Sequence, residues 1–270
     1  TIDGLIAKMV GRSLESFYDW KISNTARETA AQEVSGIVSE AVHGVSFSVR
    51  QGEIVGVAGL PDSGKDELVS CLFGLVAHEG TVRVAGRTAS ITSPASAIRQ
   101  GLALIPADRR GSGAILVMNV EDNIVTSVVG DLSPGGLVRR GALHQIGERY
   151  VRDLDVRIAS MRQKMGTLSG GNQQKVILGR GLATRPTVLL LHEPTRGIDV
   201  GAKAEIYTIL QQLAADGVAI LIVSSELPEL ISQCDRILVM YAGRISGEFD
   251  RASATEEAIL ACAMGQAASV

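Results

Sequence analysis

The sequence predicts an α/β protein with a mostly parallel sheet and an inserted, largely helical subdomain. Short apolar runs recur without alternating polar residues, a pattern typical of parallel strands that are covered on both faces. Helix-like segments lie between these runs, as expected where crossover helices join parallel strands. Aromatic residues make up only 3% of the chain, whereas glycine occurs 30 times, and such small side chains favour close packing of helices on a sheet.

The predicted strands are rich in valine, isoleucine, leucine and alanine, and their length is usual for buried strands. They span residues 54–58, 102–105, 188–191, 218–223 and 237–240. The predicted helices span residues 65–73, 171–183 and 202–216. Helices and strands therefore largely alternate along the chain, which indicates a parallel sheet.

Residues from about 108 to 168 differ from the rest of the chain. They favour helix and contain no apolar run comparable to the predicted strands. We therefore expect a helical subdomain inserted between the strand at 102–105 and the helix at 171–183.

The two ends of the chain resemble each other. Residues 1–11 and 255–265 share a threonine, two branched aliphatic residues, an alanine and a glycine at the same spacing. One interpretation is that residues 1–32 are the last helix of a preceding copy followed by a polar linker, so that the chain is part of a longer tandem protein. The alternative is that two short amphipathic helices look alike by chance.

Composition excludes several classes of protein. The net charge is −3, from 26 basic and 29 acidic residues, which does not support nucleic-acid binding. The apolar run at 218–223 is far shorter than the roughly 20 residues that cross a bilayer. The 3 cysteines are widely spaced, so we expect buried thiols and no disulfide framework or zinc site.

A glycine-containing loop follows the first predicted strand and precedes a predicted helix. It consists of Gly59, Leu60, Pro61, Asp62, Ser63, Gly64, Lys65 and Asp66. Small residues, a helix N-terminus and a lysine are what a phosphate-binding P-loop requires. The usual final serine or threonine, whose hydroxyl would hold magnesium, is replaced by Asp66. Asp66 could also be an ordinary acidic residue in the first turn of a helix.

A second anion site is predicted at the start of the helix at 171–183. Its residues are Leu168, Ser169, Gly170, Gly171, Asn172 and Gln173. A serine hydroxyl and free backbone amides at a helix N-terminus suit a phosphate presented from outside, although a serine and glycine cap would look the same.

Glu193 follows the apolar run at 188–191 and His192, where the carboxyl end of a strand borders the ligand crevice. It is therefore the candidate group for polarising water.

In this order, the motifs resemble those of the nucleotide-binding domain of ATP-binding-cassette (ABC) transporters. The resemblance rests on the P-loop, the signature at 168–175, the Walker B strand and a D-loop with Asp199. Further stretches are similar to the C-terminal half of the tandem ATP-binding subunit of bacterial monosaccharide importers of the ribose, galactose and xylose type. These stretches are residues 52–60, 106–110, 193–203 and 223–229.

The resemblance implies a P-loop NTPase (RecA-like) core with a mixed sheet and a small antiparallel β region. It implies a nucleotide-binding domain at 33–250, a C-terminal helix and tail at 251–270, and ATP and Mg²⁺ as cofactors. The implied partners are a preceding ATPase half, transmembrane permease subunits and, indirectly, an extracellular or periplasmic sugar-binding protein, with no nucleic acid. The implied location is the cytoplasmic face of the bacterial membrane, as a peripheral protein.

The chain departs from the family pattern at several positions. His192 replaces the Walker B aspartate, Ala107 falls at the Q-loop position, and Ser225 replaces the switch histidine. Where an aromatic residue would stack on adenine, only Ile37 and Val38 are present. Together these changes imply weak binding and hydrolysis of Mg-ATP at the chain's own site.

Asp66 and His192 are candidates for a direct contact. In the family, the P-loop hydroxyl and the Walker B carboxylate lie side by side around the metal, so we expect these two side chains to form a hydrogen bond. Two alternatives remain: the two changes could be independent, and Asp66 could itself bind Mg²⁺, although a carboxylate so near a triphosphate also repels it.

The intact signature suggests how such a chain would work. In the family, each nucleotide lies between the P-loop of one cassette and the signature of the other. The resemblance therefore implies the ATPase domain of a sugar importer that is weakly active or inactive alone, with Ser169 and its neighbours completing the site of the partner half. A non-hydrolysing regulatory or scaffold cassette, or an importer of nucleosides or another small polar solute, are the alternatives.

Overall fold

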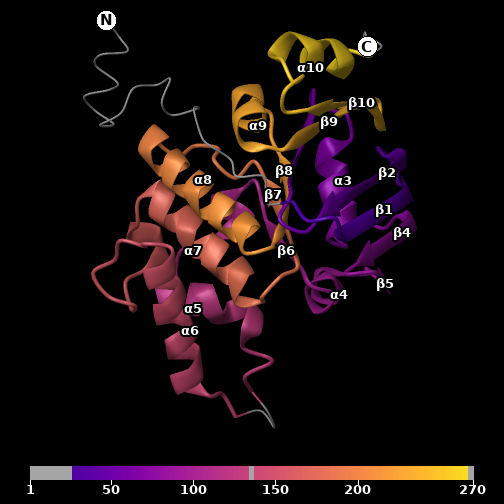
Figure 1. Cartoon of the computed structure of the whole chain (residues 1–270). Coiled ribbons are helices and arrows are strands. Elements are labelled where there is room, and N and C mark those ends of the chain that lie inside the picture. The colour runs from indigo at the N-terminus through magenta and orange to yellow at the C-terminus, as the bar shows by residue number, and fades with distance from the viewer. Residues whose placement is uncertain (1–25, 134–136, 267–270) are drawn as a thin grey trace, which may run out of the picture.

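The five predicted strands lie side by side in a six-stranded sheet (Figure 1). The computed structural model describes residues 26–133 and 137–266. In these residues the strand order is β10-β9-β3-β8-β7-β6, with β10 antiparallel to β9 and the other neighbours parallel. The strands are β3 (Ile54–Gly59), β6 (Leu102–Ile105), β7 (Val188–His192), β8 (Ala219–Val223), β9 (Arg236–Tyr241) and β10 (Arg244–Asp250). The sheet is therefore mixed, as expected.

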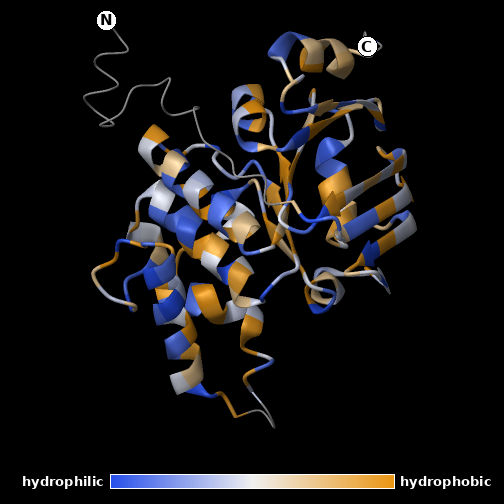
Figure 2. Cartoon of the chain, viewed as in Figure 1, coloured by the Kyte–Doolittle hydropathy of each residue, from blue (hydrophilic) through white to orange (hydrophobic). Residues whose placement is uncertain are grey.

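Alternate residues of each central strand face opposite sides of the sheet, and both sides are buried. In β3, Val55 and Val57 belong to the hydrophobic cluster on the side of α3 (Lys65–Leu72). Ile54 and Ala58 belong to the cluster on the side of α7 (Gly170–Ala183). Figure 2 shows these strands as an apolar layer between the helices. Burial on both faces explains why the strands lack polar alternation in the sequence.

A second, four-stranded antiparallel sheet covers the α3 side, in the order β2-β1-β4-β5. Its strands are β1 (Ala30–Val38), β2 (His43–Arg50), β4 (Glu79–Val84) and β5 (Arg87–Ala89), and α4 (Pro94–Arg99) follows them. This sheet is the small antiparallel region that the resemblance implied. β1 begins at Ala30, three residues before the domain boundary that we predicted at 33, because Ala31 and Gln32 are completely buried in the strand.

Between β6 and α7 the described residues are largely helical, as predicted. This segment contains α5 (Val120–Val125), α6 (Arg140–Asp153) and single turns at Arg109–Gly113, Thr126–Val128 and Met165–Thr167. Its only backbone pairing of the β type, among the described residues, is an isolated bridge between Asn119 and Lys164. α5 and α6 pack against α7, so their buried side chains join the same cluster as the sheet.

The chain continues through α8 (Val200–Ala215) and α9 (Leu227–Gln233) and ends in α10 (Glu256–Ala263). The Thr255 side chain accepts a hydrogen bond from the Ala258 N–H and caps α10, and Gly265, with a φ of 83°, ends it. The proposed N-terminal counterpart at residues 1–11 lies outside the described residues.

The described residues bear on two expectations from composition. None of their helices has the length and apolarity to cross a membrane. Cys71, Cys234 and Cys262 are buried free thiols, as predicted.

Candidate nucleotide site and signature turn

Three parallel strands bring the candidate residues of the nucleotide site to one edge of the sheet. β3 ends at Gly59 before the P-loop, β7 ends at His192 before Glu193, and β8 lies between them and is followed by Ser224 and Ser225. The carboxyl ends of parallel strands form the edge at which α/β proteins bind ligands. Residues that are more than 120 positions apart in the sequence therefore meet there.

The backbone of the P-loop has the shape expected of a phosphate cradle. Gly64 has a φ of 93°, and a Cβ at this position would lie 2.3 Å from the carbonyl oxygen of Ala41. Only glycine can occupy such a position without displacing the chain. Gly64 caps α3, whose first N–H groups have no acceptor within the helix and can point toward an anion. The hydroxyl of Ser63 is buried and has no hydrogen-bond partner in the described part of the chain.

Lys65, Asp66 and His192 form a compact cluster, which includes the predicted contact between Asp66 and His192. Lys65 Nζ donates to Asp66 Oδ1 at 2.7 Å. Nε2 of His192 lies 3.0 Å from the same oxygen. Because an ionised carboxylate only accepts hydrogen bonds, Nε2 of His192 carries a proton in this contact. One carboxylate oxygen therefore binds both the P-loop lysine and the residue at the Walker B position.

The cluster keeps Asp66 ionised. The hydrogen bond from His192 lowers the pKa of the Asp66 carboxyl well below its ordinary value, and Lys65 acts in the same direction through a hydrogen bond and its charge. Partial burial opposes both. The side chain of Lys65 is only 5% exposed, whereas that of Asp66 is 52% exposed.

The residues present do not fit Mg²⁺ as the resemblance implied. Mg²⁺ prefers oxygen ligands in a near-octahedral arrangement. His192 instead presents an N–H group, which already donates to Asp66. Oδ1 of Asp66 accepts this hydrogen bond and a second one from Lys65.

Glu193 lies at the end of β7 in a constrained conformation. Its φ is 49°, in the left-handed region that non-glycine residues rarely adopt. Its carboxylate accepts a hydrogen bond from the backbone N–H of Ser225 at 2.9 Å, and the hydroxyl of Ser224 lies 3.5 Å away. Ser225, which the resemblance assigns to the switch position, thus contacts Glu193 through its backbone. Ala107, which it assigns to the Q-loop, lies just beyond β6 and has no polar side chain.

The position at which adenine would stack has fewer available side chains than the sequence suggested. Ile37 is completely buried in the core and cannot stack on a base, so only Val38, which is 40% exposed, remains of the two candidates.

A hollow of about 350 Å³ lies beside the P-loop, lined by Ala41, Asp62, Gly64, Asp66, Glu67, Ser70 and Val76. Sequence analysis overlooked Glu67, which accepts hydrogen bonds from Ser39 at 2.5 Å and from the Ala41 N–H at 2.8 Å. These bonds tie the turn between β1 and β2 to α3.

The signature turn lies at the N-terminus of α7 and is exposed at Ser169. Ser169 is exposed, and its hydroxyl accepts a hydrogen bond from Asn172 at 3.0 Å. Leu168 and Gln173 are buried, and Gln173 donates to the carbonyl of Leu168 at 3.1 Å. Among the described residues, no hydrogen bond or ion pair joins residues 168–175 to the P-loop. The turn is therefore held by hydrogen bonds within its own motif, while Ser169 remains exposed.

Two close contacts join the signature turn to the D-loop region. A Cβ on Gly171 would lie 2.4 Å from the Cβ of Ala202 in α8. The guanidinium of Arg109 lies against Gly170, and its Nη2 donates to the carbonyl of Gly197 at 3.5 Å. Asp199 caps α8 by accepting a hydrogen bond from the Ala202 N–H at 2.9 Å. Arg109 belongs to the stretch at 106–110, and its contact with this turn was not predicted because only the fold brings the two together.

A buried polar network also escaped sequence analysis. The Glu229 carboxylate accepts hydrogen bonds from Thr195, Lys203 and Tyr207, each at 2.6 Å. Thr195 and Lys203 belong to the stretch at 193–203, and Glu229 belongs to the stretch at 223–229. Burial and the Glu229 charge raise the pKa of the Tyr207 hydroxyl. The network holds the loop that carries Glu193 against the helix that follows Ser225.

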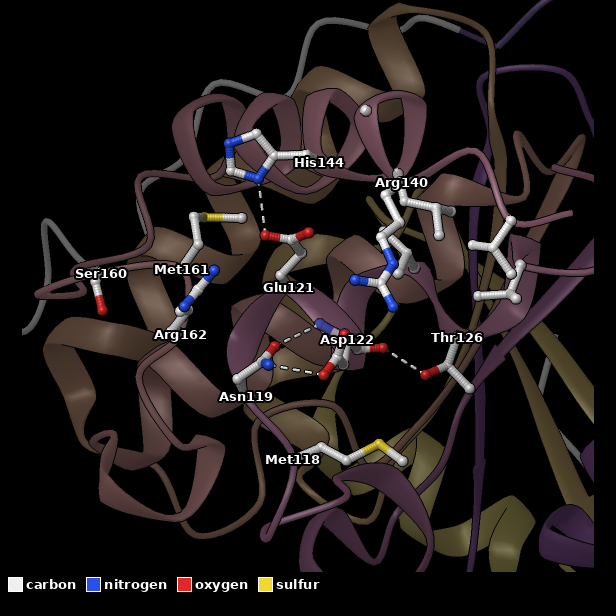
Figure 3. Close-up of a pocket in the computed structure, with 15 residues that line it drawn as sticks. Met118, Asn119, Glu121, Asp122, Thr126, Arg140, His144, Ser160, Met161 and Arg162 are labelled. Carbon is white, nitrogen blue, oxygen red and sulfur yellow. Dashed lines mark hydrogen bonds and ion pairs between the residues drawn. The ribbon is translucent and has the colours of Figure 1, made fainter. Parts of the chain in front are cut away.

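A second hollow lies on the helical segment, between α5 and α6 (Figure 3). It has a volume of about 1010 Å³ and includes Met118, Val125, Val129 and Met161 in its wall. At its edge, Nδ1 of His144 lies 2.8 Å from Glu121, and Nε2 lies 3.2 Å from Glu148. The exposed side chains of Val117 and Leu137, at 81% and 79%, lie on the same segment.

Comparison with known proteins gives consistent matches. The sequence pattern described as "ABC transporter" matches residues 42–196. The chain is 45% identical to the ribose import ATP-binding protein RbsA 2 of Streptomyces avermitilis, over 100% of this chain and 53% of that protein. It is 40% identical to the xylose import ATP-binding protein XylG of Geobacillus kaustophilus, over 98% of this chain and 54% of that protein. The chain thus spans about half the length of these relatives.

Solved structures show the same fold. A nucleotide-free ATP-binding cassette from an ABC transporter superposes with a TM-score of 0.69 at 24% identity, covering 82% of this chain and 92% of that chain. The ADP conformation of MJ1267, an ATP-binding cassette of an ABC transporter, gives a TM-score of 0.69 at 25% identity, covering 86% and 94%.

Proposed function

Because the chain belongs to the ABC transporter family, we propose that it is an ATP-binding domain of a bacterial sugar importer and acts mainly through its signature turn. Similarity to ribose and xylose import ATP-binding proteins supports the substrate class. The proposed partners are a preceding ATPase half on the same polypeptide, transmembrane permease subunits and, indirectly, a sugar-binding protein. The proposed location is the cytoplasmic face of the membrane, as a peripheral protein.

The exposed signature turn is the observation that carries this proposal. Ser169 is exposed and Gly170 and Asn172 are half-buried, while Leu168 and Gln173 are buried and hydrogen-bonded to each other. A helix N-terminus with an exposed hydroxyl suits a phosphate that is presented by another molecule or another half of the same protein. The nucleotide site of this chain, by contrast, lacks the Walker B carboxylate, the P-loop hydroxyl and the switch histidine. This asymmetry favours a signature that completes the partner's site and a P-loop of low activity.

The proposal predicts unequal effects of two substitutions in the full tandem protein. Ser169→Ala should reduce ATP hydrolysis by about 10²-fold or more, since it removes a donor aimed at the phosphate of the partner's nucleotide. Lys65→Ala should reduce it by less than about tenfold, because the site of Lys65 contributes little turnover. Steady-state phosphate release measures both rates, and the separate chain should hydrolyse ATP slowly or not at all. A larger loss from Lys65→Ala than from Ser169→Ala would contradict the proposal.

A non-hydrolysing regulatory or scaffold cassette is the second candidate function. His192, Ser225 and Ala107 favour it, because none of them supplies the carboxylate, imidazole or polar group of the family pattern. The Ser169→Ala variant separates the two functions, since a scaffold would leave the hydrolysis rate of the tandem protein unchanged.

The helical segment is the proposed contact of the permease. The hollow between α5 and α6 and the exposed apolar side chains of Val117 and Leu137 support this placement. Isolated exposed apolar residues are ordinary, but their occurrence beside a hollow is typical of protein contacts.

A further inference from the structure

The geometry points to a nucleotide site that works without a divalent cation: a nucleotide held at this P-loop is bound metal-free, with the Lys65, Asp66 and His192 cluster in the place of the metal. This inference rests on the proposed function, in that it takes the P-loop as a nucleotide site. It concerns the form of the ligand at this site and is independent of the signature turn.

The first step of the argument is that the cluster is complete without a metal. Asp66 Oδ1 accepts one hydrogen bond from Lys65 at 2.7 Å and one from His192 at 3.0 Å. The charge of the lysine, which is almost fully buried, is balanced by the carboxylate next to it. A cation placed between Asp66 and the end of β7 would meet the N–H of His192 and would have to displace it from Asp66.

The second step concerns what remains to hold phosphate. The first N–H groups of α3 have no acceptor within the helix, and Gly64 opens the loop toward them. The Ser63 hydroxyl, on a residue that is only 4% exposed, lacks a partner among the residues the structure describes. The loop therefore retains donors for phosphate oxygens. Divalent cations, by contrast, need oxygen ligands. Lys65 and His192 both bind Oδ1 of Asp66, so only Oδ2 of this carboxylate is unengaged.

The third step is a competition for Lys65. In the structure Lys65 donates a hydrogen bond to Asp66, so a phosphate oxygen must compete with Asp66 for the ammonium group. His192 can keep Asp66 satisfied during this exchange because it binds the same oxygen. The negative charge of Asp66 also remains close to the phosphates and weakens binding. Metal-free nucleotide binding at this site is therefore expected to be weak and to be limited by Asp66.

The experiment measures binding, not turnover, on the 270-residue chain. The dissociation constant of ATP carrying a fluorescent N-methylanthraniloyl group is determined in excess Mg²⁺ and in EDTA. Wild type should bind more weakly in Mg²⁺, because excess Mg²⁺ converts the free nucleotide to its metal complex. The double variant Asp66→Ser/His192→Asp restores the hydroxyl and the carboxylate of the family pattern and should bind about tenfold more tightly in Mg²⁺ than in EDTA. The pair Asp131→Ser/His78→Asp makes the same two exchanges outside the cluster and should behave like wild type.

A second variant keeps the inference testable if the double variant does not fold. Asp66→Asn frees Lys65 and removes the repelling charge, so it should tighten ATP binding in EDTA by about tenfold, since a repulsion of about 1.4 kcal/mol corresponds to that factor. Electron paramagnetic resonance of Mn²⁺ with ATP should show no protein-bound ion in wild type.

Three results would overturn the inference. They are equal or tighter binding of ATP by wild type in Mg²⁺, a protein-bound Mn²⁺ signal that Asp66→Asn removes, and no binding of ATP under either condition. None of them affects the proposed role of the signature turn, which depends on the Ser169 variant of the tandem protein.

Discussion

At the scale of single residues, Asp66 and His192 are two departures from the pattern that the resemblance implies, and we propose that they compensate for each other. Asp66 stands where the resemblance implies a P-loop hydroxyl, and His192 stands where it implies a Walker B carboxylate. The two side chains meet at 3.0 Å, so a carboxylate is present beside the end of β7 although it comes from the loop. Lys65 pairs with it at 2.7 Å, which avoids a buried unpaired cation. The exchange preserves local charge balance and changes the chemistry that the site can perform.

His144 allows a pH-dependent prediction at the same scale. The hydrogen bond and charge of Glu121 raise the pKa of the His144 imidazole above its ordinary value of 6.5, and Glu148 adds to the effect. Because the folded state holds the proton more tightly, the contribution of His144 to stability is fully present below pH 6.5 and is lost as the pH rises through the raised pKa. The stability difference between wild type and His144→Ala should therefore shrink from pH 6 to pH 9.

Proton NMR titration of the imidazole tests the cause directly. The titration midpoint of His144 should lie above 6.5 in wild type and should move back toward 6.5 in Glu121→Gln, which keeps the size of the side chain but not its charge. A midpoint that does not change in Glu121→Gln would show that the contact in Figure 3 does not control this histidine.

At the scale of elements, α7 and α8 form the support of the signature turn. Lys175 of α7, only 2% exposed, binds Glu205 of α8 at 2.7 Å and the carbonyl of Asp155 at 2.9 Å. Gly171 permits the close approach of the two helices at Ala202. The start of α7 is thus held between α8 and the loop before it. The proposed role of the turn, in which it binds a phosphate carried by another molecule, requires such a rigid base.

The contact between Gly171 and Ala202 gives a prediction for these helices. Gly171→Ala places a Cβ 2.4 Å from that of Ala202, which forces the helices apart and should cost about 1–3 kcal/mol of unfolding free energy. Adding Ala202→Gly should recover most of this loss. Chemical denaturation followed by circular dichroism measures the change.

Gly141 provides the matched control. A Cβ on this glycine of α6 would meet no atom within 4 Å, so Gly141→Ala should be neutral or stabilising by up to about 0.5 kcal/mol. Equal effects of the two alanine substitutions would contradict the close approach at Gly171.

At the scale of the whole molecule, the helical segment and the sheet share one core. Leu143 of α6, Val120 and Ile124 of α5, and Ile220 of β8 belong to the same hydrophobic cluster. α7 is the element that connects them, since it packs against α5, α6 and β6. The helical segment is therefore inserted in the sequence but is not separate in its packing.

A shared core predicts cooperative unfolding of the described parts of the chain. Leu143→Ala removes a side chain that is 7% exposed and should lower stability by about 2–3 kcal/mol. Because the cluster is continuous, the substitution should shift one unfolding transition and should not produce a separate transition of the helical segment. Leu137→Ala, at a side chain that is 79% exposed, is the control and should leave the transition unchanged. Two transitions in differential scanning calorimetry would contradict the shared core.

The sequence by itself determined five strands of the larger sheet, three of the helices and the order of the motifs. The runs at 54–58, 102–105 and 188–191 became β3, β6 and β7 with ends within one residue of prediction, because burial on both faces leaves a continuous apolar pattern. The P-loop with its glycines was also readable, since local backbone geometry requires those residues.

Only the tertiary structure decided which distant side chains meet. The hydrogen bond of Asp66 to His192 was a hypothesis that geometry could confirm, whereas the network around Glu229 and the contact of Arg109 with Gly170 had no signal in the sequence. Ile37 looked available to a base and proved completely buried. The physical reason is that local patterns record which face of an element is covered, while contacts between side chains depend on how separate elements pack.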